Sequence, residues 1–194
     1  PKKIIVVLGF HTVETWDESQ YDALINWKAH LSFLEDIIKI AKNIKNSFFV
    51  LRYKNIDWIN ISFFKEILKE INQLENLILS EDYNEYFISY QLCAHADLII
   101  AKHTSIGDEC LSLEIPVLFH EYSHNTSQQM SSLYKYKIDV MCFNFNDLFE
   151  KTSKILSSKK NKIIDYKKLK DLYYGDLSDG KVVIRAQNHI ISML

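Results

Sequence analysis

ADLIIAKHTSIGDECLSLEIPVLFHEYSHN, residues 96–125, holds two short apolar runs separated by a polar turn and a short amphipathic segment. Apolar runs of this length bounded by turn residues are typical of buried strands, whereas the segment between them repeats its apolar residues at helical spacing. The order strand, tight loop, helix, strand is that of one unit of a parallel sheet. We therefore predict strands over Asp97–Lys102 and Pro116–Glu121, joined by a helix over Ile106–Leu113.

The same alternation of apolar runs and amphipathic segments continues along the rest of the chain. Further strands are predicted at Lys3–Gly9, Ser47–Tyr53, Asn76–Ser80 and Asp139–Phe143. Further helices are predicted at Ala23–Ile44, Ser62–Leu74, Asn84–His95, Ser127–Lys135, Asn146–Leu156 and Gly180–Met193. This pattern indicates an α/β fold, a Rossmann-like doubly wound sheet of about six parallel strands with helices on both faces. Ligands of such folds bind beyond the carboxyl ends of the strands.

Composition narrows the class of protein. With 194 residues and 47% hydrophobic residues, the chain fits one domain over residues 1–194. A formal net charge of -2 gives little support to nucleic-acid binding. The three cysteines fit buried structural positions, and no apolar run approaches the ~18–20 residues of a membrane span, so we expect a cytoplasmic protein. The segment Lys151–Lys170 holds eight lysines and one acid, which suits a solvated face or peripheral contact with the inner face of an anionic membrane.

The turn before the central helix carries the most specific chemistry. Ser105 and Asp108 form a capping-box pattern, which predicts a helix beginning near Ile106 with free backbone N–H groups around Thr104–Gly107. Such a helix end suits a phosphate, and the absence of a Cβ at Gly107 would let a diphosphate approach closely. One turn further, the Glu109 carboxylate is placed to accept hydrogen bonds from ribose hydroxyls, or it complements the helix dipole.

The sequence ECLSLEIPV, residues 109–117, resembles the E-A-x-x-x-G-x-P-V signature in the C-terminal domain of GT-B glycosyltransferases and of the related UDP-N-acetylglucosamine 2-epimerases. The resemblance implies that Glu109 contacts the ribose. It also implies diphosphate binding by the preceding turn, which comprises His103, Thr104, Ser105, Ile106 and Gly107. Two positions depart from the family. Glu114 replaces a usual Gly, so this turn must differ or Glu114 must tolerate an unusual backbone conformation, and Ala101 replaces the second Glu of many retaining members.

Three other strand-end segments are candidates for the cleft. In the first segment, His120 either donates a hydrogen bond to phosphate, with a catalytic role left open, or is a structural histidine. Glu121 and His124, which follow it, are further candidates. A zinc site from these three residues is not predicted, because two His four apart bind together on a helix and this segment reads as a loop. Gly9, Phe10, His11 and Thr12 follow the first strand without a G-x-G-x-x-G pattern, which gives an NAD site no support, and Ser80–Asn84 is the expected base contact.

We therefore predict a glycosyltransferase domain that binds a nucleotide-sugar donor as substrate, with no cofactor and no metal. The resemblance extends to bacterial capsule and surface-polysaccharide transferases. It implies that the chain is the C-terminal half of a larger protein, whose N-terminal acceptor domain or partner subunit supplies the catalytic base. Three alternatives stay open: a sugar-nucleotide 2-epimerase, the donor-binding subunit of a split glycosyltransferase, and a non-enzymatic interaction module.

Overall fold

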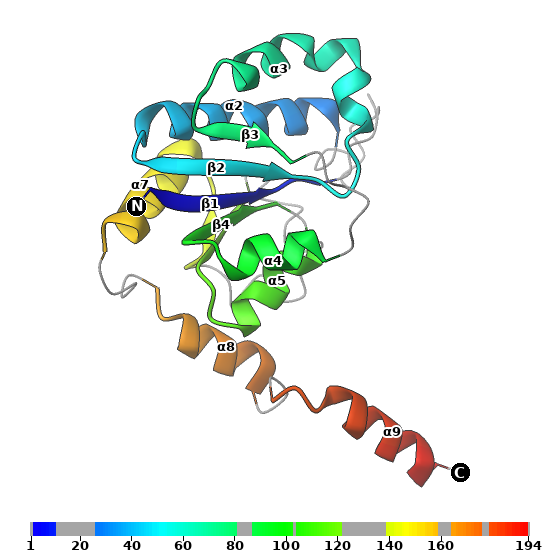
Figure 1. The fold of residues 1–194 in the computed structure, drawn as a ribbon. Helices are drawn as coiled ribbons and strands as arrows, with labels where there is room; N and C mark the ends of the chain where they lie inside the picture. Colours follow the sequence, from blue (N-terminus) through cyan, green and yellow to red (C-terminus); the bar gives the residue numbers. More distant parts are fainter. Residues whose placement is uncertain are drawn as a thin grey trace.

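The strands form one parallel sheet in the order β3-β2-β1-β4-β5-β6 (Figure 1). The structure, a computed structural model, describes residues 2–10, 26–80, 87–102, 104–121, 139–158, 164–175 and 179–193. All six predicted strands are present, each within two residues of its expected ends, and the Rossmann-like α/β prediction is confirmed. The strands are β1 Lys3–Leu8, β2 Ser47–Arg52, β3 Leu77–Leu79, β4 Leu98–Ala101, β5 Val117–His120 and β6 Met141–Cys142.

Most of the predicted helices are also present. They are α2 Trp27–Asn43, α3 Lys65–Asn72, α4 Ile88–Ala94, α5 Ser105–Ser112, α7 Phe145–Ser157 and α9 Val182–Ser192. The helix α2 begins four residues later than expected, because Asn26 caps it by accepting a hydrogen bond from the Ala29 amide at 2.8 Å. The predicted helix 127–135 lies outside the described residues.

The predicted helix Ser62–Leu74 consists of a short 3-10 helix, η2 Ser62–Phe64, followed directly by α3. Two elements were not expected from the sequence, the 3-10 helix η1 Asp57–Asn60 and the helix α8 Tyr166–Tyr174. The last of these lies in the lysine-rich run, where exposed Lys167 and Lys168 obscure a buried stripe formed by Tyr166 and Leu169. Asp165 caps α8 by accepting a hydrogen bond from the Lys168 amide at 2.9 Å.

Helices cover both faces of the sheet. Successive side chains of a strand point to opposite faces. Phe119 of β5 lies against Gly107 of α5, whereas the next residue, His120, contacts Asp36 of α2 on the other face. The helices α4 and α5 therefore pack on one face of the central strands, and α2 and α7 lie on the other (Figure 1).

The core lies between the central strands and these helices. The strands β4 and β5 are buried along their whole length, as is typical of strands covered on both faces. From α2, a stripe at helical spacing enters the core, and it includes Phe33, Leu34, Ile37, Ile40 and Ala41. The three cysteines are reduced and buried, as predicted.

The two C-terminal helices are attached differently. The helix α8 packs on the body of the domain through Ile164, Tyr166 and Leu169, and the Tyr166 hydroxyl donates to the Val117 carbonyl at 3.3 Å. The helix α9 projects away from the body (Figure 1), and none of its residues is buried. Among the described residues, no helix combines the length and the apolar character that crossing a membrane requires.

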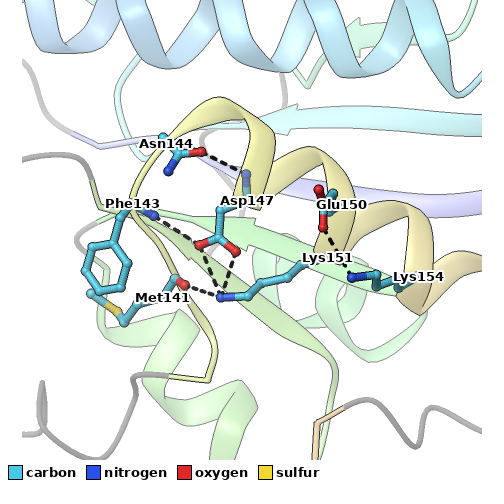
Figure 2. Close-up of polar contacts among 7 residues, drawn as sticks. All are labelled: Met141, Phe143, Asn144, Asp147, Glu150, Lys151 and Lys154. Carbon is cyan, nitrogen blue, oxygen red and sulfur yellow. Dashed lines mark hydrogen bonds and ion pairs between the residues drawn. The ribbon is translucent and has the colours of Figure 1, made fainter.

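The N-terminus of α7 is closed by its own side chains (Figure 2). Asn144 accepts a hydrogen bond from the Asp147 amide at 2.9 Å, and Asp147 accepts one from the Phe143 amide at 3.3 Å. The Lys151 ammonium donates to the Met141 carbonyl at 2.6 Å and lies 3.1 Å from Asp147. Lys151, the first lysine of the lysine-rich segment 151–170, therefore contacts other residues of the fold.

Candidate functional site

The helix α5 begins at the carboxyl edge of the sheet without a side-chain cap. Thr104 is its N-cap residue in an extended conformation and makes no cap hydrogen bond. The predicted capping box is wrong, because the helix begins one residue early and Ser105 stands inside it rather than at the cap. The Gly107 amide bonds to the Thr104 carbonyl at 3.1 Å. Within the described residues, no side chain satisfies the first-turn amides in the way that Asn144 does for α7.

Glu109 lies on the exposed surface one turn after this helix start. Its carboxylate faces the Tyr90 hydroxyl of α4, and hydrogen bonding to Glu109 raises the pKa of Tyr90. Both side chains are solvent-accessible, so a ligand hydroxyl can compete for the carboxylate. The ribose contact of Glu109 stays a prediction, and Tyr90 is a neighbour that the sequence did not indicate.

Gly107 has a packing reason to be glycine. A Cβ at this position would lie 2.9 Å from the Phe119 ring and 3.2 Å from the Cβ of Ala101. Gly107 therefore allows α5 to pack tightly on β4 and β5, which is one of the established uses of glycine in this type of fold. Closer approach of a diphosphate is a separate property and stays a prediction. Thr104 and Ile106 are half-buried and Ser105 is exposed, whereas His103 lies outside the described residues.

The end of β1 is built into the core. A Cβ at Gly9 would overlap the ring of buried Tyr53, so the glycine makes room for that side chain. Phe10 is buried, with its ring 5.1 Å from His30 and 5.9 Å from Phe33. His11 and Thr12 lie outside the described residues.

His120 and Glu121, at the end of β5, are each only 1% exposed. The His120 Nε2 lies 3.2 Å from Oδ2 of Asp36, and its ring meets Phe33 edge-on. Burial lowers the pKa of His120, and the hydrogen bond to Asp36 opposes that effect. The structure thus buries His120 between the end of β5 and α2. A role towards phosphate stays a prediction, and His124 lies outside the described residues.

A buried charged cluster under the strand ends was missed by the sequence analysis. It consists of Lys102, Asp36, His120 and Glu121, with His30 alongside. Burial lowers the pKa of Lys102 to about 8, although the carboxylates of Glu121 and Asp36 oppose this shift. The sequence did hold a signal, because Lys102 directly follows four buried apolar residues and a lysine is almost never fully buried without a partner.

Arg52 is a second buried cation at this edge. It ends β2, its Nε donates to the Ser89 hydroxyl at 3.0 Å, and its Nη1 donates to the Ser80 hydroxyl at 3.4 Å. Arg52 therefore joins the end of β3 to the start of α4. Ser80 is the one described residue of the predicted base-contact segment 80–84.

Two cavities lie among the described residues. One, of about 660 Å³, lies against the sheet beside α4, where Ile4, Val50 and Ile78 line it, and it extends to Ser80 at the end of β3. The other, of about 400 Å³, lies near Lys2 and Asn76. In the part of the chain that the structure describes, no three His, Cys, Asp or Glu side chains gather as a metal site requires.

Solved structures share this fold. A putative UDP-N-acetylglucosamine 2-epimerase from Listeria monocytogenes matches with a TM-score of 0.60 and 12% identity, over 98% of this chain and 46% of that protein. The UDP-GlcNAc 2-epimerase from Neisseria meningitidis, bound to UDP-GlcNAc, matches with a TM-score of 0.59 and 17% identity, over 97% of this chain and 45% of that protein. No protein-family model and no curated protein matches the sequence. The chain thus has a fold found in sugar-nucleotide epimerases and spans about half their length.

Proposed function

We propose that this chain binds the nucleoside-diphosphate part of a sugar nucleotide and serves as the donor-binding domain of a glycosyltransferase. The observation that carries the proposal is the start of α5, where uncapped amides at the carboxyl edge of the sheet precede the exposed carboxylate of Glu109 by one turn. Amides at a helix start bind phosphate oxygens, and a carboxylate accepts hydrogen bonds from vicinal hydroxyls. A solved neighbour of the same fold binds UDP-GlcNAc, which supports this class of ligand.

In the proposed transfer, the acceptor oxygen bonds to the anomeric carbon while the bond from that carbon to the diphosphate oxygen breaks. The α5 amides stabilise the charge on the leaving diphosphate. The acceptor proton passes to a base that we place in a second domain or partner subunit, because the chain spans about half the length of its structural neighbours. Because His120 and Glu121 are each only 1% exposed, we do not assign them a direct contact with the acceptor.

A sugar-nucleotide 2-epimerase is the second candidate. Both solved neighbours described above carry that name, and an epimerase would use the same contacts to the diphosphate and ribose. Incubation of the chain, together with its companion domain, with a UDP sugar and no acceptor distinguishes the two. A change of configuration at C2 without an acceptor supports the epimerase, whereas transfer only in the presence of an acceptor supports the glycosyltransferase.

Contact with a membrane stays a prediction. Lys151, Lys154 and Lys170 form ion pairs with Asp147, Glu150 and Glu114. Lys167 and Lys168, exposed on α8, are the described lysines that we propose for such a contact at the inner face of the membrane. Sedimentation with vesicles containing phosphatidylserine, compared with neutral vesicles, tests it through the double variant Lys167→Glu and Lys168→Glu.

The binding proposal is tested by calorimetric titration of the chain with UDP, GDP, CDP and CMP. We expect one of these nucleotides to bind, and Glu109→Ala to weaken that binding by about 1–3 kcal/mol, since a charged hydrogen-bond acceptor is lost. Glu66→Ala, which removes an equally exposed helical carboxylate from α3, is the matched control and should bind as the wild type does. Equal affinity of wild type and Glu109→Ala for every nucleotide would contradict the assignment.

A further inference from the structure

Lys102 lies where the order of the strands in the sheet reverses. From β1 the chain adds β2 and β3 on one side, and β4, β5 and β6 then follow on the other side, so β1 and β4 are neighbours at the point of reversal. After β1 the chain returns along α2 on one face, and after β4 it returns along α5 on the opposite face. In open α/β sheets the ligand crevice forms where adjacent connections leave for opposite faces. Lys102 directly follows β4 at this crevice, and Phe10 follows β1.

The Lys102 side chain is largely buried there, and among the described residues no acceptor forms a hydrogen bond with its ammonium. Its side chain is 6% exposed, and its Nζ lies 5.3 Å from the centre of the Phe10 ring. The carboxylates of Glu121 and Asp36 attract it, yet across the described residues no carboxylate lies within the 4.0 Å of an ion pair and no acceptor bonds to it. Burying a charge away from hydrogen-bond partners is costly, and an anionic ligand group that bonds to the ammonium would offset this cost.

One of the two nearby carboxylates, that of Asp36, contacts other cationic or polar groups. Asp36 contacts the His120 ring at 3.2 Å and, from the surface, the Lys39 ammonium at 3.4 Å. Lys102 therefore keeps its hydrogen-bonding capacity while the surrounding negative charge holds it protonated at neutral pH. An ammonium in this state suits an anionic ligand group that arrives from the crevice.

We propose that Lys102 binds a phosphate oxygen of the nucleoside diphosphate at the crevice between β1 and β4, as a second phosphate contact besides the amides of α5. This rests on the proposed function. Only one residue, His103, separates Lys102 from the N-cap Thr104, so the ammonium and the open helix start belong to the same sheet edge. Phosphate is the ligand class that both groups recognise, because one supplies a point charge and the other supplies fixed N–H donors.

The test separates phosphate contacts from ribose contacts by titrating three probes, UDP, uridine and inorganic diphosphate, against the same variants. Lys102→Met should lower the affinity for UDP and for inorganic diphosphate by about tenfold or more, because a charge-assisted hydrogen bond is lost, and it should leave the affinity for uridine unchanged. Glu109→Ala should lower the affinity for UDP and uridine but leave the affinity for inorganic diphosphate unchanged. Lys42→Met, which removes an exposed lysine at the far end of α2, is the control and should bind all three probes normally.

A folding defect in Lys102→Met is distinguished by Lys102→Arg, which keeps the charge and should recover most of the binding of inorganic diphosphate. The wild-type affinity for UDP should also fall as the pH rises through about 8, where Lys102 loses its proton. The other groups that face it are Asp36 and His30 from α2 and His120 and Glu121 from the end of β5. Burial lowers the pKa of both histidines, which keeps them neutral in this range.

The outcomes separate the two proposals. If wild type binds UDP and Lys102→Met binds both UDP and inorganic diphosphate equally well, the Lys102 contact is overturned and the donor-binding function stands. If wild type binds inorganic diphosphate through Lys102 but binds no nucleotide more tightly than diphosphate, the phosphate site stands and the nucleotide proposal fails. Binding of none of the probes overturns both.

Discussion

Lys102, which follows β4, and Lys151, in α7, are two lysines of the same domain in different environments. Lys151 lies in the middle of α7, and its ammonium reaches back to bond to the Met141 carbonyl at 2.6 Å and to pair with Asp147, while part of its side chain stays in water (Figure 2). Lys102 lies under the ends of β1 and β4, 6% exposed, with no such bond to any described residue. The pKa of Lys102 is lowered to about 8 by burial.

The helix starts near the two lysines also differ in how their amides are capped. Around Lys151, the Asn144 side chain caps α7 by accepting from the Asp147 amide, and the Asp147 carboxylate accepts from the Phe143 amide just before the helix. Around Lys102, the adjacent helix α5 starts without a side-chain cap. Polar groups that are satisfied by their own chain stabilise the fold, whereas buried polar groups left short of partners indicate a site where a ligand completes them.

The largest expected effect is acid destabilisation through the buried cluster. His30 bonds to the Tyr53 hydroxyl at 2.8 Å, and burial lowers its pKa to about 3. Between pH 6.5 and 3 the unfolded chain binds a proton that the folded chain excludes, so the free energy of unfolding should fall by about 3 kcal/mol from pH 7 to pH 4. Urea denaturation over this range measures it.

His30→Gln should flatten this acid dependence, with a residual slope from His120, whose pKa is lowered in the same direction. His189→Gln, on the exposed helix α9, is the control and should keep the wild-type slope. A slope that His30→Gln leaves unchanged would contradict the assignment of the acid response to the buried cluster.

The next largest effect is a change in the free energy of unfolding at alkaline pH, which we attribute to Lys102. The pKa of Lys102 is about 8 in the folded chain and 10.5 for an ordinary lysine, so the unfolded chain binds more protons between these values. This contribution to the free energy of unfolding should rise with pH, by about 2 kcal/mol by pH 9.5. Burial raises the pKa of Cys142 to about 12, which acts in the opposite direction above pH 9.

The measured quantity is therefore the difference between wild type and Lys102→Met in urea denaturation from pH 7 to pH 9.5. That difference should change with pH, because only the wild type carries the buried ammonium. A constant difference for Lys102→Met would show that this lysine is better solvated than its burial implies.

A smaller effect compares the two helix starts directly. Asn144→Ala removes the cap of α7 and should lower the free energy of unfolding by about 1 kcal/mol without changing nucleotide affinity. Thr104→Ala, at the equivalent position of α5, removes no cap bond and should change stability by less than ~0.5 kcal/mol. Thermal or urea denaturation measures both, and a larger loss for Thr104→Ala would reveal a cap in solution.

The smallest effect concerns Lys170, an intermediate case that pairs with Glu114 at 3.1 Å while both remain partly exposed. Glu114 has a φ of 59°, a left-handed conformation that favours glycine. Glu114→Gly should relieve about 1 kcal/mol of backbone strain and lose an ion pair worth less than that, for a net gain of a few tenths of a kcal/mol. Glu114→Ala, which keeps the strain and loses the pair, should be slightly destabilised in the same assay.

The sequence predicted the sheet well because its evidence is local. The run Leu98–Ala101 is apolar throughout and bounded by polar residues, which is enough to indicate a buried strand. The departure at Glu114 was also visible, and of the two alternatives left open there the structure shows the unusual backbone conformation. The helix α8 was missed because lysines dominate its composition and leave only two residues, Tyr166 and Leu169, to mark its inner face.

The site was predicted only in part. The open helix start and Glu109 follow from a short contiguous motif. The contacts among Lys102, Asp36 and His120 join segments up to 84 residues apart, and no spacing within the sequence relates them. The reason for glycine at Gly107 likewise depends on Phe119, a residue of the neighbouring strand.

The sequence by itself determined the order of strands and helices, the polarity of each strand end and the chemical groups available there, because short-range periodicity and turn residues encode them. Only the tertiary structure decided which of those groups are buried together, which helix end is capped and which lysine lacks a hydrogen-bonded partner among the described residues. Burial and hydrogen bonding depend on contacts between distant segments, and those contacts fix the energies of charged groups far more than residue type does.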